Sequence, residues 1–149
     1  MNQNNAVKRR VFCIGMNKTG TSSIKHCFEI LGLTPLASPR SMNFRSRRLI
    51  RKFYKDRNYE PLLKLAENYQ SFEDRPWNMW EMYRHLDARF PDSLFILTVR
   101  DAKSWWGSTD RWISVSKPYA ADRYKQHLQV ADANPEAMIA SYLRYNEEV

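Results

Sequence analysis

One segment near the N-terminus carries the residue types that bind phosphate groups. Residues 15–23 read Gly-Met-Asn-Lys-Thr-Gly-Thr-Ser-Ser, so a lysine and several hydroxyls lie among two glycines. In a loop of this kind, backbone N–H groups turn toward one point, and a following helix adds positive potential at its first turn. The sequence therefore predicts a phosphate loop at residues 15–23. The alternative is an ordinary turn between a strand and a helix.

The position of the lysine separates this loop from the nucleoside-triphosphate loop. In that loop the lysine directly follows the second glycine and reaches the β- and γ-phosphates. Here Thr21 follows Gly20, and Lys18 lies two residues before that glycine. We expect a lysine so placed to reach the single group attached to a 5′-phosphate. A P-loop nucleotide or small-molecule kinase is the second interpretation, disfavoured by the lack of an evident Mg²⁺-binding acid after a strand.

A second cluster lies at residues 99–108, which read Val-Arg-Asp-Ala-Lys-Ser-Trp-Trp-Gly-Ser. Arg100 directly follows the most apolar run of the chain, and Ser108 falls on the helical face of Asp101. An arginine with a hydroxyl suits a phosphomonoester, because the guanidinium fork matches two oxygens at once. Taken alone, the pair would read as a surface arginine and an ordinary helix serine.

Asp74 is the candidate for a carboxylate that accepts a proton from a substrate. It follows a short segment, 69–73, and precedes Pro76. Glu73 would point to the opposite side of a strand. The histidines His26 and His85 fit structural or solvent-facing roles better. The alternative for Asp74 is capping of the turn before the proline.

The elements that must position these residues alternate between strand and helix. Strands are predicted at 10–14, 69–73 and 94–99, the last one covered on both faces. The pattern predicts an α/β fold, a three-layer P-loop-like domain with a small parallel sheet flanked by helices. Ligands bind beyond the carboxyl ends of such strands, where the two clusters and Asp74 lie. Helices are predicted at about 21–31, 42–56, 60–69 and 77–90, after Asp101, and after Asn134.

The charge of the chain is concentrated in one segment. The formal net charge is +8, and residues 40–57 hold eight basic residues against a single acidic one, Asp56. Such a stripe attracts anionic surfaces, glycans or nucleic acid. A helix face that is simply exposed to solvent would explain the basic residues equally well. A non-catalytic polyanion-binding remnant of the fold is therefore a third interpretation.

The remaining composition points to a soluble protein. Cys13 and Cys27 are both predicted to be buried, without metal-ligand spacing, so no metal is expected. No apolar run approaches the ~18 residues of a membrane span. Residues 1–10 lack a signal-peptide apolar region. We expect a cytoplasmic protein with a flexible tail at residues 1–9 and one domain at 10–149.

Together these segments resemble the sulfotransferases that use 3′-phosphoadenosine-5′-phosphosulfate (PAPS). The phosphate loop looks like their 5′-phosphosulfate loop, and Leu94–Ser108 looks like their signature for the 3′-phosphate. The stretches 74–77 and 89–101 are similar to the corresponding stretches of one soluble branch of this family. In that branch the loop also contains the residues Lys-Thr-Gly-Thr-Ser. The resemblance runs from about Val11 to Val149, and two motifs in order make it specific.

The resemblance implies in-line transfer of a sulfuryl group from PAPS to a hydroxyl or amine, without a metal. It implies that Lys18 stabilises charge on the leaving phosphate, that Asp74 is the base, and that Arg100 and Ser108 hold the 3′-phosphate. The acceptor would be a small molecule or glycan, with an anionic one suggested by residues 40–57. Members usually continue past this chain's last helix, so the usual C-terminal part would be lacking. The residues holding the 5′-phosphosulfate would be Asn17, Lys18, Thr19, Gly20, Thr21 and Ser22.

Overall fold

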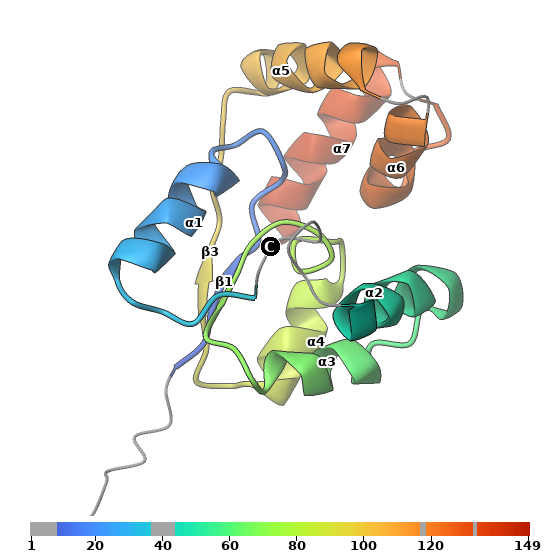
Figure 1. Cartoon of the computed structure of the whole chain (residues 1–149). Coiled ribbons are helices and arrows are strands. Elements are labelled where there is room, and N and C mark those ends of the chain that lie inside the picture. The colour runs from blue at the N-terminus through green and yellow to red at the C-terminus, as the bar shows by residue number, and fades with distance from the viewer. Residues whose placement is uncertain (1–8, 37–43, 117–118, 133) are drawn as a thin grey trace, which may run out of the picture.

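The computed structural model describes residues 9–36, 44–116, 119–132 and 134–149. Its sheet has three parallel strands in the order β2-β1-β3. The central strand β1 (Val11–Cys13) pairs with β2 (Ser71–Phe72) on one side and with β3 (Leu94–Ile96) on the other. All three strands end at the same edge of the sheet, so the segments that follow them meet there (Figure 1).

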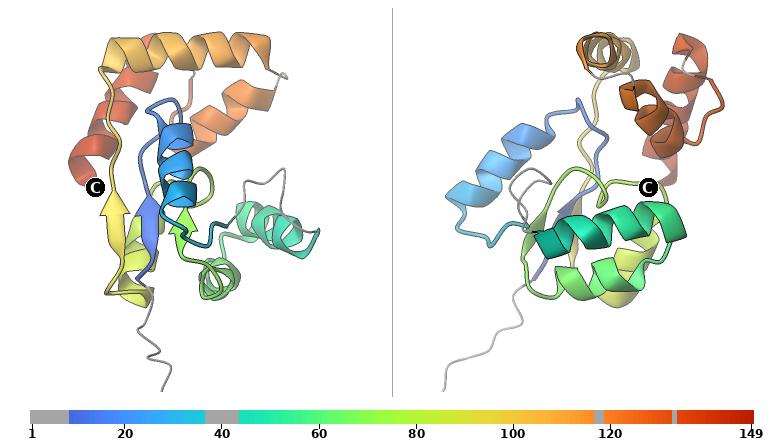
Figure 2. Two further views of the ribbon diagram at one scale, coloured as in Figure 1. Left: turned by 60° about the vertical axis from the view of Figure 1, so that its left-hand side comes forward. Right: turned by 45° about the vertical axis from the view of Figure 1, so that its right-hand side comes forward.

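Helices cover both faces of this sheet and its carboxyl edge. Helix α1 lies on one face, helices α2 to α4 contribute to the core on the other, and α5 to α7 gather beyond the strand ends (Figure 2). This arrangement confirms the predicted α/β class with a small parallel sheet flanked by helices. The helices of the described residues are α1 Thr21–Ile30, α2 Phe44–Asp56, α3 Glu60–Ala66, α4 Met82–Arg89, α5 Ala102–Val115, α6 Tyr119–Leu128 and α7 Pro135–Glu148.

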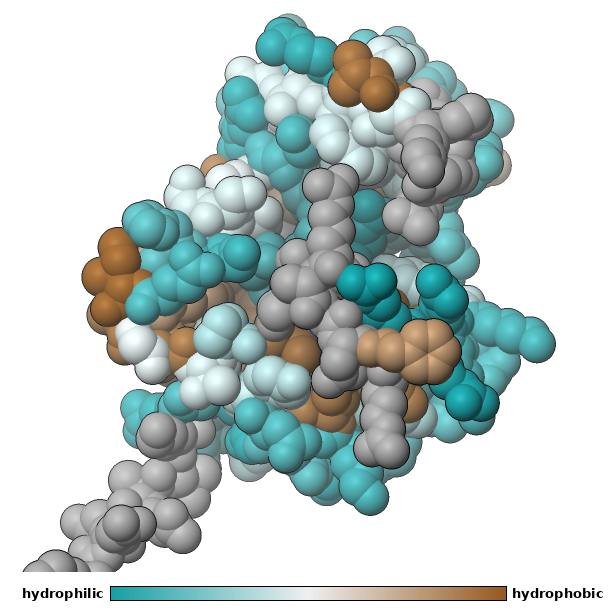
Figure 3. All heavy atoms as spheres, viewed as in Figure 1, coloured by the Kyte–Doolittle hydropathy of each residue, from teal (hydrophilic) through white to brown (hydrophobic). Residues whose placement is uncertain are grey.

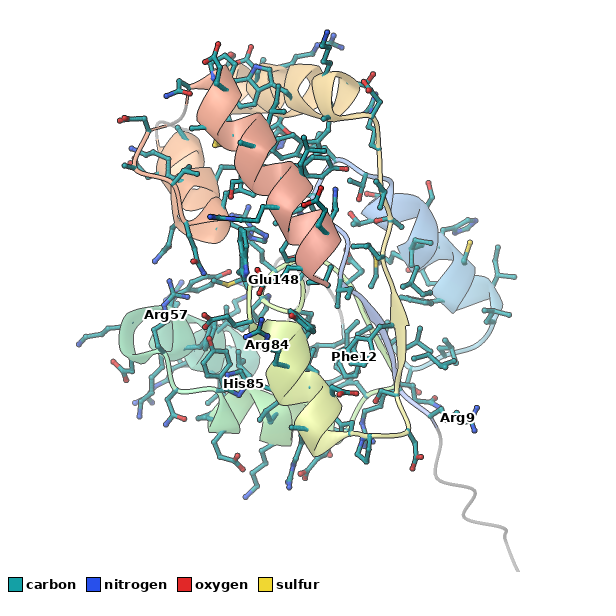
Figure 4. The ribbon with its side chains drawn as sticks, turned by 180° about the vertical axis from the view of Figure 1, so that it is seen from behind. Arg9, Phe12, Arg57, Arg84, His85 and Glu148 are labelled. Atoms are coloured by element: carbon teal, nitrogen blue, oxygen red, sulfur yellow. The ribbon has the colours of Figure 1, made fainter. Side chains whose placement is uncertain are left out.

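Two apolar cores hold the layers together. In the first, the ring of Phe12 stacks between aromatic rings of β2, β3 and the end of α4. The second lies among α5, α6 and α7, where the rings of Trp105 and Tyr142 stack 4.3 Å apart. Arg84 of α4 forms an ion pair of 2.6 Å with Glu148, and so fastens the end of α7 beside the first core (Figure 4). The strand ends are thus fixed between two packed regions.

Local signals for the helices are confirmed at three positions. The side chain of Asp101 accepts a hydrogen bond of 2.8 Å from the backbone N–H of Ser104 and begins α5. Asn134 does the same for α7, where Pro135 occupies the first turn. Gly32 ends the α1 region at a positive φ of 66°.

Other expectations were wrong, and packing explains why. Residues 94–99 were expected to be covered on both faces, but β3 is an edge strand and half of Leu94 is exposed. Cys27 is exposed rather than buried, because α1 presents a narrower apolar face to the sheet than its pattern indicates. The helix expected from residue 77 begins only at Met82, after a series of turns, and α3 ends at Ala66. Helix α6 was not predicted at all.

The expected tail at residues 1–9 lies outside the described residues except for Arg9. No helix within the described ranges has the length and apolar character needed to span a bilayer.

Candidate functional site

The phosphate loop leaves β1 and leads into the first turn of α1. Gly20 is the residue before the helix and has a φ of 102°, in the left-handed region that glycine tolerates best. No side chain caps this end of α1, and the first turn holds no acidic residue. Within the described residues, the backbone N–H groups of Thr21 and Ser22 have no hydrogen-bond acceptor. They are therefore available to an anion, as helix N-termini commonly are.

The loop is attached firmly to the connection between β3 and α5. The hydroxyls of Thr19 and Thr98 lie 2.6 Å apart, and Gly15 packs directly against Thr98. The indole N–H of Trp105 donates to the carbonyl oxygen of Asn17 over 3.0 Å. Asn78 donates to the carbonyl of Gly15 from the other side, over 2.9 Å. Segments far apart in sequence thus give the loop one defined shape.

Arg100 lies at the same end of the sheet as Lys18. Its Nη1 donates to the carbonyl oxygen of Lys18 over 3.3 Å, while its backbone is held by the hydroxyl of Tyr142. Lys18 itself has a φ of 74°, an uncommon conformation for a residue with a side chain. Lys18 and Arg100 thus belong to one group of loop residues at the strand ends, which is called the loop cluster below. Ser108 lies farther along α5, half-buried, and its side chain forms no hydrogen bond with another described residue.

Asp74 joins the same cluster from the end of β2. Its carboxylate oxygen Oδ1 accepts hydrogen bonds from the side-chain amide of Asn17 and, over 2.7 Å, from the backbone N–H of Arg75. The residue has a positive φ of 63°, at the first of the turns that lead to α4. Hydrogen bonds at the strand ends therefore bring together Asn17, Lys18, Thr19, Asp74 and Arg100, whereas the side chain of Ser108 forms none among the described residues.

Glu73 differs from Asp74 in its electrostatic environment. Burial raises the pKa of Glu73 to about 7, the adjacent Asp74 adds to this, and Lys25 of α1 opposes it. Because the charges of Lys25 and Glu29 act on Glu73, its carboxyl group lies within electrostatic reach of α1. Strand alternation predicts that Glu73 and Asp74 point to opposite sides, but β2 ends at Phe72, and no signal in the sequence marks the raised pKa of Glu73.

Replacing Glu73 with Gln is expected to stabilise the protein above pH 7. The pKa is about 7 in the folded protein and 4.5 when the group is free, so stability falls as the pH rises through this window. Gln cannot ionise, so the gain is about 1–2 kcal/mol at pH 8, after allowance for solvent screening, and near zero at pH 4. Thermal unfolding at both pH values measures the difference. A variant less stable than the parent at pH 8 contradicts it.

The five tryptophans and the histidines His26 and His85 separate into core and surface residues. Trp77, Trp80 and Trp105 are buried, whereas Trp106 and Trp112 are half-buried. His26 is exposed beside Glu29, and the ring of His85 stacks on Tyr59. The candidates for contact with an aromatic ligand are therefore reduced to Trp106 and Trp112.

Sequence reasoning missed residues that α6 brings next to the candidate site. The ring of Tyr124 lies 5.5 Å from the guanidinium carbon of Arg75, and His127 is fully buried nearby. Burial, and secondarily the charge of Arg75, lowers the pKa of His127 to about 3. The imidazole is therefore neutral at physiological pH. No motif marks these residues, since only packing of α6 brings them to the turn after β2.

The described part of the basic segment, residues 44–57, consists of α2 and the residue after it. Its apolar residues Ile50 and Phe53 are buried in the first core, and hydrophilic residues gather over the outer side (Figure 3). Arg40 and the side chain of Arg45 lie outside the described residues. An anionic partner for this surface stays a prediction. The exposed basic residues are Arg47, Arg48, Arg51, Lys52, Lys55 and Arg57.

Comparison with known proteins identifies the family of this chain. The family model described as "Sulfotransferase domain" matches residues 10–149, which include the loop cluster and all of the helices. A search of curated proteins returned no match to the chain.

Proposed function

Because this chain belongs to the sulfotransferase domain family, we propose that it transfers a sulfuryl group from PAPS to a hydroxyl or amine acceptor. When bound, the donor supplies the sulfuryl group and a phosphate leaving group. The transfer breaks the bond between sulfur and the phosphate oxygen and forms a bond between sulfur and the acceptor oxygen or nitrogen. The acceptor's proton passes to a carboxylate of the protein.

One observation carries this proposal, namely the contact between Arg100 and the phosphate loop. Nη1 of Arg100 donates to the backbone carbonyl of Lys18, so the guanidinium lies beside the loop that carries the Lys18 ammonium, and one bisphosphate would reach both cations. The uncapped first turn of α1 adds two free N–H donors at the same place. A site for an adenosine bisphosphate needs this pairing of two anion-binding positions, because the nucleotide carries a phosphate at each end.

The protein's own residues fit the proposed roles. The backbone N–H groups of Thr21 and Ser22, with the hydroxyl-bearing loop, would hold the 5′-phosphate, and Lys18 would offset charge that develops on it. Arg100, together with Ser108 of α5, would hold the 3′-phosphate. Asp74 would accept the acceptor's proton through Oδ2, since Oδ1 is already hydrogen-bonded to Asn17 and Arg75. These bonds also fix the carboxylate relative to the loop.

Binding of 3′-phosphoadenosine-5′-phosphate (PAP) tests the proposal without knowledge of the acceptor. We expect saturable binding by calorimetry, and Arg100→Ala should weaken it about 10- to 100-fold, from the ~1.5–3 kcal/mol of hydrogen bonds to charged groups. Ser108→Ala should weaken it less. Arg111→Ala, an exposed arginine farther along α5, serves as the matched control and should leave the affinity unchanged.

Two results would contradict the proposal. One is the absence of saturable PAP binding by the folded chain. The other is a preference for ATP with Mg²⁺ over PAP, which would favour a kinase.

A further inference from the structure

Arg75 occupies a distinctive place between the proposed proton acceptor and α6. Its backbone N–H donates to Oδ1 of Asp74, so the residue is fixed at the start of the turn that follows β2. Its side chain extends toward α6, where the guanidinium carbon lies 5.5 Å from the centre of the Tyr124 ring. The charge of Arg75 also reaches the buried ring of His127, on the same helix. Arg75 thus connects the candidate site with α6, one of the helices beyond the strand ends.

The guanidinium of Arg75 has no oxygen partner within the described residues. Among the described arginine side chains, only Arg10 and Arg75 are half-buried. Arg10 donates to the carbonyl oxygens of Ala66 and Glu67, and the exposed Arg84 pairs with Glu148. Within the described ranges, the side chain of Arg75, by contrast, lies against the Tyr124 ring and donates no hydrogen bond to another residue.

This difference has an energetic consequence. A guanidinium has five N–H donors in a planar fork and cannot lose its proton in a protein. Donors left unpaired in a partly buried position cost free energy, which an oxyanion in bidentate contact would recover. The surroundings favour an anion further, because the neighbouring His127 stays neutral and so does not compete for it. The adjacent acid, Asp74, contacts the backbone N–H of Arg75 rather than the guanidinium.

We infer that Arg75 binds an oxyanion on the acceptor, so that the substrates are hydroxyl or amine compounds that also carry a carboxylate, phosphate or sulfate group. This inference rests on the proposed function, in which Asp74 accepts the proton. Adjacent Cα atoms lie about 3.8 Å apart, so the side chains of residues 74 and 75 can engage two groups of one small molecule. Arg75 would hold the anionic group while Asp74 faces the reacting hydroxyl or amine, and the selectivity for anionic acceptors would come from this position rather than from α2.

The test uses the full chain saturated with PAP, so that the proposed donor site is filled. The probes are inorganic sulfate, 4-hydroxybenzoate and its uncharged methyl ester, titrated by calorimetry. We expect the two anions to bind and the ester to bind at least about tenfold more weakly. Arg75→Gln should weaken binding of both anions about tenfold or more and leave the PAP affinity within about twofold. Arg111→Gln should change neither.

A second variant keeps the test decisive if Arg75→Gln does not fold. Arg75→Lys retains the charge and the stem that contacts Tyr124, but it lacks the planar fork, so anion binding should weaken by about three- to tenfold. Equal anion affinity in the parent and in both variants overturns the inference, as does an equal loss of PAP affinity, which would place Arg75 in the donor site. Failure of the parent chain to bind PAP is a separate outcome and overturns the proposed function itself.

Discussion

Replacing Lys18 with Ala is expected to slow sulfuryl transfer by about 10²- to 10³-fold, the usual effect of removing one group that stabilises developing charge. Lys18 lies in the phosphate loop, and its carbonyl oxygen accepts a hydrogen bond from Arg100. That contact involves the backbone, so it survives the loss of the ammonium group. The effect should therefore fall mainly on turnover, with PAP affinity weakened by about tenfold at most, because the free N–H donors of α1 persist.

The backbone at position 18 does not complicate this comparison. Lys18 has a φ of 74°, and Ala carries the same Cβ penalty in the left-handed region as Lys does. The measurement is release of PAP from radiolabelled PAPS in the presence of an acceptor obtained by screening. Lys25→Ala is the matched control, since Lys25 lies one turn into α1 and pairs with Glu29. Transfer by Lys18→Ala at the parental rate would remove Lys18 from the catalytic role.

The second large effect is expected from Gly15→Ala, which should destabilise the protein by about 3 kcal/mol or more and also abolish PAP binding. An added Cβ would lie 2.0 Å from Oγ1 of Thr98 and 2.7 Å from both the backbone nitrogen and the carbonyl oxygen of Thr98. Backbone atoms cannot rotate away as a side chain can. The loop or the β3–α5 connection must therefore shift, which separates Lys18 from Arg100.

Urea denaturation of matched variants measures this effect. Gly107→Ala is the control, because nothing lies within 4 Å of its added Cβ and the residue lies inside α5. There alanine should be neutral or stabilise the helix by about 0.5–1 kcal/mol. Adding Thr98→Ala to Gly15→Ala removes only the side-chain contact, so it should restore little stability. Full restoration by Thr98→Ala would show that the backbone contacts do not matter.

Much of the fold could be predicted because its signals are local. The phosphate loop was recognisable from its glycines, hydroxyls and lysine, and the helices after Asp101 and Asn134 were recognisable from their capping residues. The order of strands and helices then implied a parallel sheet with ligands at its carboxyl edge. Each of these inferences needs only neighbouring residues or a repeated spacing. The family assignment follows from the same order of motifs and agrees with the match over residues 10–149.

The errors concern features that depend on the position of an element within the fold. An apolar run such as 94–99 reads the same in a central strand and at an edge, and only the strand order shows that β3 has one neighbour. Likewise, the exposure of Cys27 depends on how α1 is rotated against the sheet. The hydrophobic pattern indicates which face of a helix or strand tends to be buried. How many neighbouring elements cover that face depends on how the whole chain folds.

The sequence by itself determined the chemical types present, namely a loop of glycines, hydroxyls and a lysine, an arginine at a strand end, and an acidic residue before a proline. Only the tertiary structure decided which of them meet: Arg100 contacts the loop, Asn17 binds Asp74, and Arg75 reaches Tyr124 on a helix that had no recognisable signal. The physical reason is that residue type and spacing are properties of short segments. The burial that raises the pKa of Glu73 and leaves Arg75 without an oxygen partner among the described residues arises when distant segments pack together.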